Sequence, residues 1–285
     1  MDSSSPSGGA VTRAGTTALR ARGEARAAFA RVGSRSAPAR VFEAGGLRLR
    51  FPRSPGPCEA VLVNTGGGMA GGDRATIELS LERAADVLAT TQSAEKIYRS
   101  EGEPARVATR LSLAAGARLA WTPQETILFD QARLERRLDA EIAEDASLLL
   151  IESVVFGRLA MGEDRIDAGF KDRWRIRRAG RLAFAEEFRL DAATQTLGRP
   201  ATGRGARAIA SFLFMAPDAA ARLDEVRATF DEHAAADGAP VEAGASALDG
   251  FVVGRALSAD PARLRALVLA VMMALTGRPA PRVWQ

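Results

Sequence analysis

A glycine cluster is the first feature of the sequence that could bind a ligand. Gly66, Gly68 and Gly71 have the G-x-G-x-x-G spacing of a dinucleotide site and directly follow an apolar run. That chemistry requires a helix that begins at the last glycine, because the N-terminal amides of the helix bind the pyrophosphate. The alternating segment 75–81 is instead typical of a strand, and Asp73 stands where a nucleotide P-loop needs a lysine. The cluster therefore predicts a sharp turn and no nucleotide site.

Other residue types that commonly carry catalysis are scarce. His233 is the only histidine and Cys58 the only cysteine, so a thiolate zinc cluster or an intramolecular disulfide cannot form. Glu125 and Asp130 could act as the acid and base of a glycoside hydrolase, but nothing in the sequence places them in a common cleft. We therefore expect a protein that is not an enzyme and has no tightly bound cofactor. The alternative is a carbohydrate-active β-solenoid enzyme, against which an aromatic content of 6% counts.

The composition describes a globular chain without a membrane segment. Of its 285 residues, 47% are hydrophobic, which suffices for a packed core. No stretch approaches the roughly 20 uninterrupted apolar residues of a membrane helix, and the first residues lack the apolar centre of a secretory signal. The net charge of +4 suits acidic protein partners, and no basic run with interleaved aromatics indicates nucleic-acid binding. We therefore expect a cytoplasmic protein that binds neither a membrane nor nucleic acid.

A loose internal repeat is the strongest architectural signal. Each copy has an aliphatic residue, a short turn, an alanine and a second aliphatic residue, and the copies begin 32 and then 29 residues apart: Leu81 to Val87, Leu113 to Leu119 and Ile142 to Leu148. A strand-turn-strand unit of this kind cannot bury its apolar face alone, so its copies stack. The repeat predicts a mainly β fold, a solenoid-like stack of strands.

The elements on either side of the repeat can also be placed. Residues 1–25 are small, polar and basic and predict a flexible tail, which leaves residues 26–285 as a single domain. Segment 41–51 alternates around a Gly-Gly turn, the pattern of a hairpin strand. Further strands are expected at 59–64, 75–81, 147–155, 173–178 and 182–190, the last two joined by a hairpin turn at 178–180.

Two helices are expected in the C-terminal third. Asp218 follows Pro217 and is expected to cap a helix that presents Leu223, Val226 and Phe230 on one face and stops near Gly238. A second helix begins after Asp260, has Pro261 at its first position, and ends at Gly277.

Five blocks of the sequence together resemble the urease accessory protein D family, also called UreD or UreH. In order along the chain they are Asn64 to Asp73, Thr90 to Ser100, Trp121 to Phe129, Phe156 to Glu163, and Pro281 to Trp284. The resemblance covers the chain from about Ala27 to its end. The Ser/Gly-rich N-terminal tail and the Gly- and Arg-rich stretch 194–207 depart from the family pattern.

The resemblance implies a maturation chaperone that is not itself an enzyme. A member of this family is expected to bind apo-urease on one side and urease accessory protein F on the other. Accessory protein F in turn recruits accessory protein G, the GTPase that supplies nickel. The alternative hypotheses are the β-solenoid enzyme described above and a structural or adhesive β-protein, which would be secreted.

The resemblance also implies a path for nickel in transit. The family is associated with a water-filled passage lined by polar and acidic groups, and the matching positions here are Asp73, Glu152 and Glu186. Carboxylates hold nickel less tightly than imidazole or thiolate, which suits transfer. Glu152 also interrupts the apolar run 148–151, where a charge must be hydrated, ion-paired or metal-bound. A salt bridge to one of the many arginines is the alternative role for each residue. For Trp284, an interface anchor and a residue that closes the core both remain open.

Overall fold

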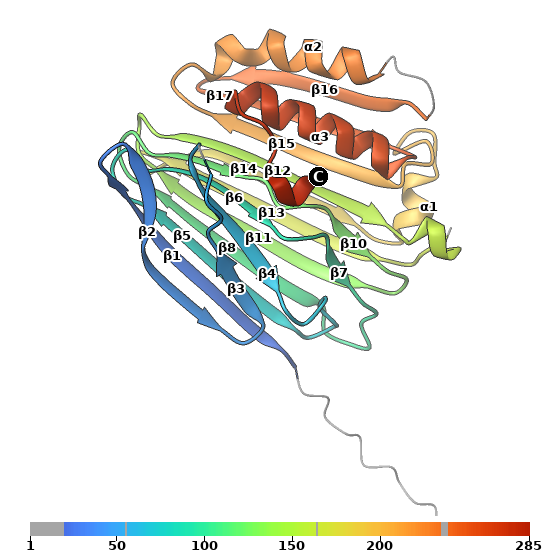
Figure 1. Ribbon diagram of the computed structural model, residues 1–285. Helices are drawn as coiled ribbons and strands as arrows, with labels where there is room; N and C mark the ends of the chain where they lie inside the picture. Colours follow the sequence, from blue (N-terminus) through green and yellow to red (C-terminus); the bar gives the residue numbers. More distant parts are fainter. Residues whose placement is uncertain (1–19, 55, 164, 235–238) are drawn as a thin grey trace, which may run out of the picture.

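The computed structural model describes residues 20–54, 56–163, 165–234 and 239–285. Most of these residues form strands in two sheets (Figure 1). Sheet A has the order β14-β13-β11-β8-β5-β1-β2. Its strands are β1 (Arg22–Val32), β2 (Arg35–Ala44), β5 (Arg74–Leu81), β8 (Ala105–Leu113), β11 (Arg133–Ile142), β13 (Gly169–Arg178) and β14 (Arg181–Leu190).

Sheet B faces sheet A and has the order β16-β17-β15-β12-β9-β6-β4-β3; in addition, β10 pairs with β12, and β7 pairs with β10. Its strands are β3 (Leu47–Arg50), β4 (Cys58–Asn64), β6 (Asp86–Thr91), β7 (Glu95–Ile97), β9 (Arg118–Trp121), β10 (Thr126–Leu128), β12 (Ser147–Phe156), β15 (Ala208–Met215), β16 (Val241–Leu248) and β17 (Phe251–Ser258). The helices are α1 (Ala193–Leu197), α2 (Leu223–Ala234) and α3 (Pro261–Thr276), and 3-10 turns occupy Leu159–Met161, Ala219–Arg222 and Arg282–Trp284.

The internal repeat is the winding unit of the fold. The chain runs along a strand of sheet A, turns, runs along a strand of sheet B and returns, so that β5, β8, β11 and β13 lie parallel, as do β4, β6, β9 and β12. The first aliphatic residues of the three copies are register partners: Leu81 lies opposite Leu113, and Leu113 opposite Ile142. The predicted mainly β, solenoid-like stack is confirmed.

Two apolar clusters hold the layers together. One fills the space between the sheets, and the other lies between the far face of sheet B and the helices α2 and α3. Strand β12 contributes to both, because Leu148 and Leu150 face sheet A whereas Leu149 and Ile151 face the helices. The molecule therefore has three layers, and the outer face of sheet A is the side opposite the helices (Figure 1).

The C-terminal helices follow the expected positions with one difference at a cap. Helix α3 has Pro261 in its first turn, and Asp260 Oδ1 accepts a hydrogen bond from Ala262 N at 2.8 Å. Asp218, expected to cap the preceding helix, makes no capping hydrogen bond, because a 3-10 turn separates it from α2. The expected end of that helix near Gly238 lies outside the described residues.

Two other expectations differ from the fold, and some strands lie outside the predicted segments. The Gly45-Gly46 turn does not form a hairpin, since β2 pairs with β1 in sheet A whereas β3 pairs with β4 in sheet B. Gly45 has φ +58°, and a Cβ there would lie 2.0 Å from the Arg22 carbonyl oxygen, so the crossing requires glycine. Strand β1 begins at Arg22, inside the range 1–25 expected to be a tail. Strands β7, β10, β15, β16 and β17 are among those that lie outside the predicted segments.

Candidate functional site

An ionic cluster lies between the two sheets, where the core is otherwise apolar. Arg136 of β11 faces inward and binds Asp172 of β13 through two hydrogen bonds of 3.1 and 2.6 Å. The same guanidinium lies 2.8 Å from Glu152 Oε2 of β12. None of the three residues is more than 8% exposed. One cation therefore holds two carboxylates together in the interior.

Two tryptophans complete the surroundings of Glu152. The indole Nε1 of Trp121 donates a hydrogen bond of 2.8 Å to Glu152 Oε1. The buried indole nitrogen of Trp174 lies near the same carboxylate but makes no hydrogen bond of normal geometry. It is a polar atom that a water molecule or another small ligand would satisfy.

Burial dominates the electrostatics of this cluster. Loss of hydration is the main reason that the pKa of Glu152 is raised to about 7. The positive charge of Arg136 lowers this pKa, whereas the negative charge of Asp172 raises it. For Arg136 burial acts to lower the pKa, but the charges of Asp172 and Glu152 outweigh it and raise the pKa above its ordinary value. Arg136 is therefore a fixed cation, whereas Glu152 can take up a proton near neutral pH.

A small cavity of about 10 Å³ adjoins the cluster, about the space of one water molecule. Its lining includes Glu152, Asp172, Trp174 and Ser211 as well as Glu186 of β14. Glu186 makes an ion pair with Arg255 of β17, across the seam where the edge of sheet A meets sheet B. Two of the three carboxylates expected on the nickel path therefore lie on one cavity, and each is ion-paired with an arginine.

The third carboxylate, Asp73, lies elsewhere. It follows the glycine turn just before β5, where its Oδ1 accepts a hydrogen bond from Ala21 N and its Oδ2 one from Ala70 N, each at 2.8 Å. It does not line the cavity described above. Its observed contacts fix the glycine turn against the start of β1.

Four of the sequence blocks that carry the family resemblance meet at the ends of the parallel strands of sheet B. Asn64 donates hydrogen bonds to the Glu95 carboxylate, which burial gives a raised pKa. Tyr98 donates to the Gly67 carbonyl oxygen at 2.9 Å and packs edge-on against Phe129. The Arg158 guanidinium lies 4.1 Å from the centre of the Phe129 ring. The blocks are thus parts of one loop platform built by successive turns of the solenoid.

The fifth block closes the core. Trp284 is 4% exposed, and its Nε1 donates a hydrogen bond of 2.9 Å to Thr90 Oγ1. Arg265 of α3 lies over the Trp284 ring and also binds Glu125 at 2.6 Å. Of the two roles left open for Trp284, the core role is the one observed. Glu125 is engaged in this ion pair, whereas Asp130 accepts a hydrogen bond from Asp167 N, so the two do not share a partner.

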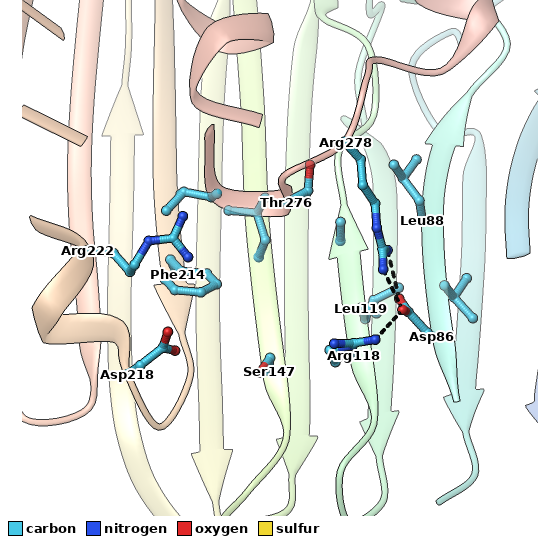
Figure 2. A pocket seen from close by; sticks show the side chains of 14 residues that line it. Asp86, Leu88, Arg118, Leu119, Ser147, Phe214, Asp218, Arg222, Thr276 and Arg278 are labelled. Carbon is cyan, nitrogen blue, oxygen red and sulfur yellow. Dashed lines mark hydrogen bonds and ion pairs between the residues drawn. The ribbon is translucent and has the colours of Figure 1, made fainter. Parts of the chain in front are cut away.

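A larger hollow of about 270 Å³ lies beside the C-terminal end of α3 (Figure 2). On one side Asp86 binds both Arg118 and Arg278 at 2.7 Å. Burial acts to raise the pKa of Asp86, but its hydrogen bonds and ion pairs with the two arginines lower the pKa below the ordinary value. Leu88, Leu119 and Phe214 are among the apolar residues that line it. These contacts attach the end of α3 to β6 and β9.

Neither a resident metal site nor a membrane helix is found in the described part of the chain. No group of three or more histidine, cysteine or acidic side chains there is arranged to hold a metal ion. No helix formed by the described residues has the length and apolar character needed to cross a membrane.

Sequence reasoning missed two members of the interior cluster, although a signal for each was present. Arg136 stands between Leu134 and Leu138 in the inward phase of its strand, and Asp172 has the same place between Phe170 and Trp174. A charged residue in the inward phase of an alternating strand must find a partner of opposite charge.

Comparison with known proteins identifies the family. The model of a family described as UreD urease accessory protein matches residues 21–285. The chain belongs to this family. It is 51% identical over 246 residues, 86% of its length and 84% of the relative's, to "Urease accessory protein UreD 1" of Methylobacterium radiotolerans. It is 49% identical over 273 residues, 93% and 91% of the two chains, to "Urease accessory protein UreD 2" of Methylorubrum populi.

A third relative has the same family name. "Urease accessory protein UreD" of Rhodopseudomonas palustris is 49% identical over 249 residues, 86% of each chain. Membership of the UreD family gives the chain a role in urease maturation, in association with urease and its accessory proteins.

Proposed function

We propose that this UreD-family chain is a non-catalytic scaffold that binds apo-urease and accessory protein F, and through F the GTPase accessory protein G, and that nickel passes along it to the urease active site. The observation that carries the proposal is the presence of Glu152, Asp172 and Glu186 on one cavity in a chain of the UreD family. Burying a carboxylate in an apolar core costs stability unless the charge is ion-paired, hydrogen-bonded or bound to a metal.

The charge balance of the cavity suits a cation in transit. Two carboxylates share the single guanidinium of Arg136, so the cluster attracts a divalent cation but offers it no closed set of ligands. Carboxylate oxygens hold nickel more weakly than imidazole or thiolate does. A nickel ion held in this way can leave again. Asp73 is a further proposed carboxylate on the nickel path, and it lies outside this cavity.

The alternative function, a carbohydrate-active β-solenoid enzyme, has less support. A glycoside hydrolase requires two carboxyl groups on either side of an open substrate cleft. Glu152 and Asp172 are buried against one arginine, and Glu125 and Asp130 bind separate partners. No feature of the described residues favours this alternative.

The test is nickel loading of urease co-expressed with accessory proteins F and G and with variants of this chain. Glu152→Gln and Glu186→Gln keep the shape of each side chain but remove its charge, and Glu101→Gln is a control at an exposed residue. Asp73→Asn tests the third carboxylate separately. We expect the two cavity variants to lower the nickel content of urease while the complex still co-purifies. Full nickel loading with both cavity variants and an intact complex would remove the proposed passage.

A further inference from the structure

The outer face of sheet A has an excess of positive charge. We define the basic face as the outward residues of β5, β8, β11 and β13, on which no described element packs. Nine of these residues are cations and four are carboxylates, an excess of five in a chain whose net charge is +4. The cations are Arg74, Arg106, Arg110, Arg133, Arg137, Lys171, Arg173, Arg175 and Arg177, and the carboxylates are Glu78, Glu135, Asp139 and Glu141.

The excess is concentrated on β13. All four outward positions from Lys171 to Arg177 are cations, and alternate residues of a strand lie about 7 Å apart. Lys171 binds Glu187 of β14 at 3.2 Å. The side chains of Arg173 and Arg175 form no ion pair or hydrogen bond with any described residue. By contrast, Arg106 and Arg110 on β8 bind Glu135 and Glu78 of the neighbouring strands.

The basic face is also hollowed. The short outward side chains of Thr76 and Ala108 are among those that line a depression of about 400 Å³. Five of the cations of the basic face line it, and Glu135 is the only carboxylate in the lining. The lining cations are Arg74, Arg106, Arg137, Lys171 and Arg173. A negatively charged side chain would enter this depression between guanidinium groups.

We propose that the basic face binds an acidic segment of a partner protein, with carboxylates of that segment along β13. The spacing fits, because carboxylates four residues apart on a helix lie about 6 Å apart and alternate residues of a strand about 7 Å apart. Guanidinium groups can bind carboxylates through two parallel hydrogen bonds, so Arg173 and Arg175 are suited to this role. The inference goes beyond the proposed nickel path and does not depend on it.

A nucleic acid fits this face less well than an acidic protein segment. Strand β11, next to the row of cations, presents Glu135, Asp139 and Glu141 outward, and these carboxylates would repel a continuous phosphate backbone. The outward positions of the four strands also hold no aromatic side chain on which a base could stack. An acidic protein segment can place neutral or basic side chains opposite β11.

The test uses the full chain and a fluorescent poly-L-glutamate peptide as the probe. The double variant Arg173→Glu/Arg175→Glu reverses the two free cations of β13. Arg53→Glu/Arg83→Glu changes the net charge equally at two exposed arginines outside the basic face. We expect the β13 variant to bind the peptide roughly tenfold more weakly, as the loss of about two ion pairs implies, and the control to bind nearly as the parent chain does. Binding by the parent chain should weaken with added salt.

Two outcomes would overturn the proposal. Equal weakening by both double variants would show that the net charge alone attracts the peptide. Tighter binding of a single-stranded oligo-dT than of poly-L-glutamate would assign the face to nucleic acid. The neutral variant Arg173→Gln/Arg175→Gln, compared with the parent chain by circular dichroism and melting, separates lost contacts from a lost fold.

Discussion

Arg136 is the residue on which the charges between the sheets depend. It is the only cation within ion-pair distance of both Glu152 and Asp172 in the described part of the chain. Without it, two carboxylates would share a dehydrated space with no opposing charge. Removing one partner of a buried ion pair costs much more than the pair itself contributes, because the remaining charge is left unpaired.

We therefore predict that Arg136→Met lowers the free energy of unfolding by about 3–5 kcal/mol. Arg137→Met is the matched control, since Arg137 is the next residue on the same strand but faces solvent, where an ion pair contributes at most about 1 kcal/mol. Urea unfolding of both variants measures the difference. Similar losses for the two would show that Arg136 does not hold the interior carboxylates.

Glu152 makes the folded protein less stable as the pH rises, which is the opposite of the usual effect of a carboxyl group. Its pKa in the folded protein is about 7, above the ordinary value of 4.5, so the folded state holds the proton more tightly than the unfolded chain does. Between these two pKa values the folded state binds more protons, and its stability falls as the pH rises. Below 4.5 and above 7 this contribution is constant.

We predict that the parent chain loses up to about 3 kcal/mol of stability relative to Glu152→Gln as the pH rises from 4.5 to 7. The variant is the reference, because it lacks the ionisable group of Glu152 but keeps every other carboxyl group of the chain. The measurement is urea unfolding of both at several pH values. A difference that stays constant, or that grows in favour of the parent chain, would contradict the raised pKa.

The repeat turns set the geometry of the solenoid. In each turn an alanine, Ala85, Ala117 or Ala146, is fully buried and donates its backbone N–H to the carbonyl oxygen three residues earlier. A larger side chain at this position would push apart the sheets that the turn connects. The alanine is therefore a packing requirement of the winding unit.

We predict that Ala117→Leu lowers the free energy of unfolding by about 1–3 kcal/mol, because the enclosed space cannot accept the added carbons. Ala114→Leu, an exposed position in the same turn, is the control and should change stability by less than about 0.5 kcal/mol. Thermal unfolding of both variants tests the prediction. Equal stability of the two variants would show that the turn has room.

The elements that could be predicted from the sequence are those whose pattern lies within a short stretch of the chain. The repeat copies are visible because stacked strands impose the same inward aliphatic positions on each turn of the solenoid. The Gly45-Gly46 crossing was misread as a hairpin, because alternation on both sides of a glycine turn looks the same whether the second strand stays in its sheet or changes sheets. Asp218 resembles a helix cap, but an intervening 3-10 turn moves the helix start to Leu223.

One residue of the candidate site could also be predicted from a pattern in a short stretch of the chain. Glu152 stands out because it breaks an apolar run, and the break is a property of the sequence alone. That Glu152 and Glu186 line one cavity depends on side-chain contacts of β14 with β17, which lies far from it in the sequence. Periodicity reports which face a residue occupies, and it does not report which other strand faces it.

At the scale of the whole molecule, the three layers offer different surfaces. Helices α2 and α3 cover sheet B, the basic face of sheet A lies on the opposite side, and the ionic cluster lies between the two sheets (Figure 1). A protein that holds two partners needs two separate faces. The proposed path for nickel runs through the layer between them.

The central claim is that this UreD-family chain is required for nickel to reach urease. The most direct measurement is the nickel content of urease purified from cells grown at limiting nickel, with accessory proteins F and G present and this chain either present or absent. Our account predicts nickel-loaded, active urease with the chain and largely nickel-free, inactive urease without it. Equal nickel content and equal urea hydrolysis in the two preparations would contradict it.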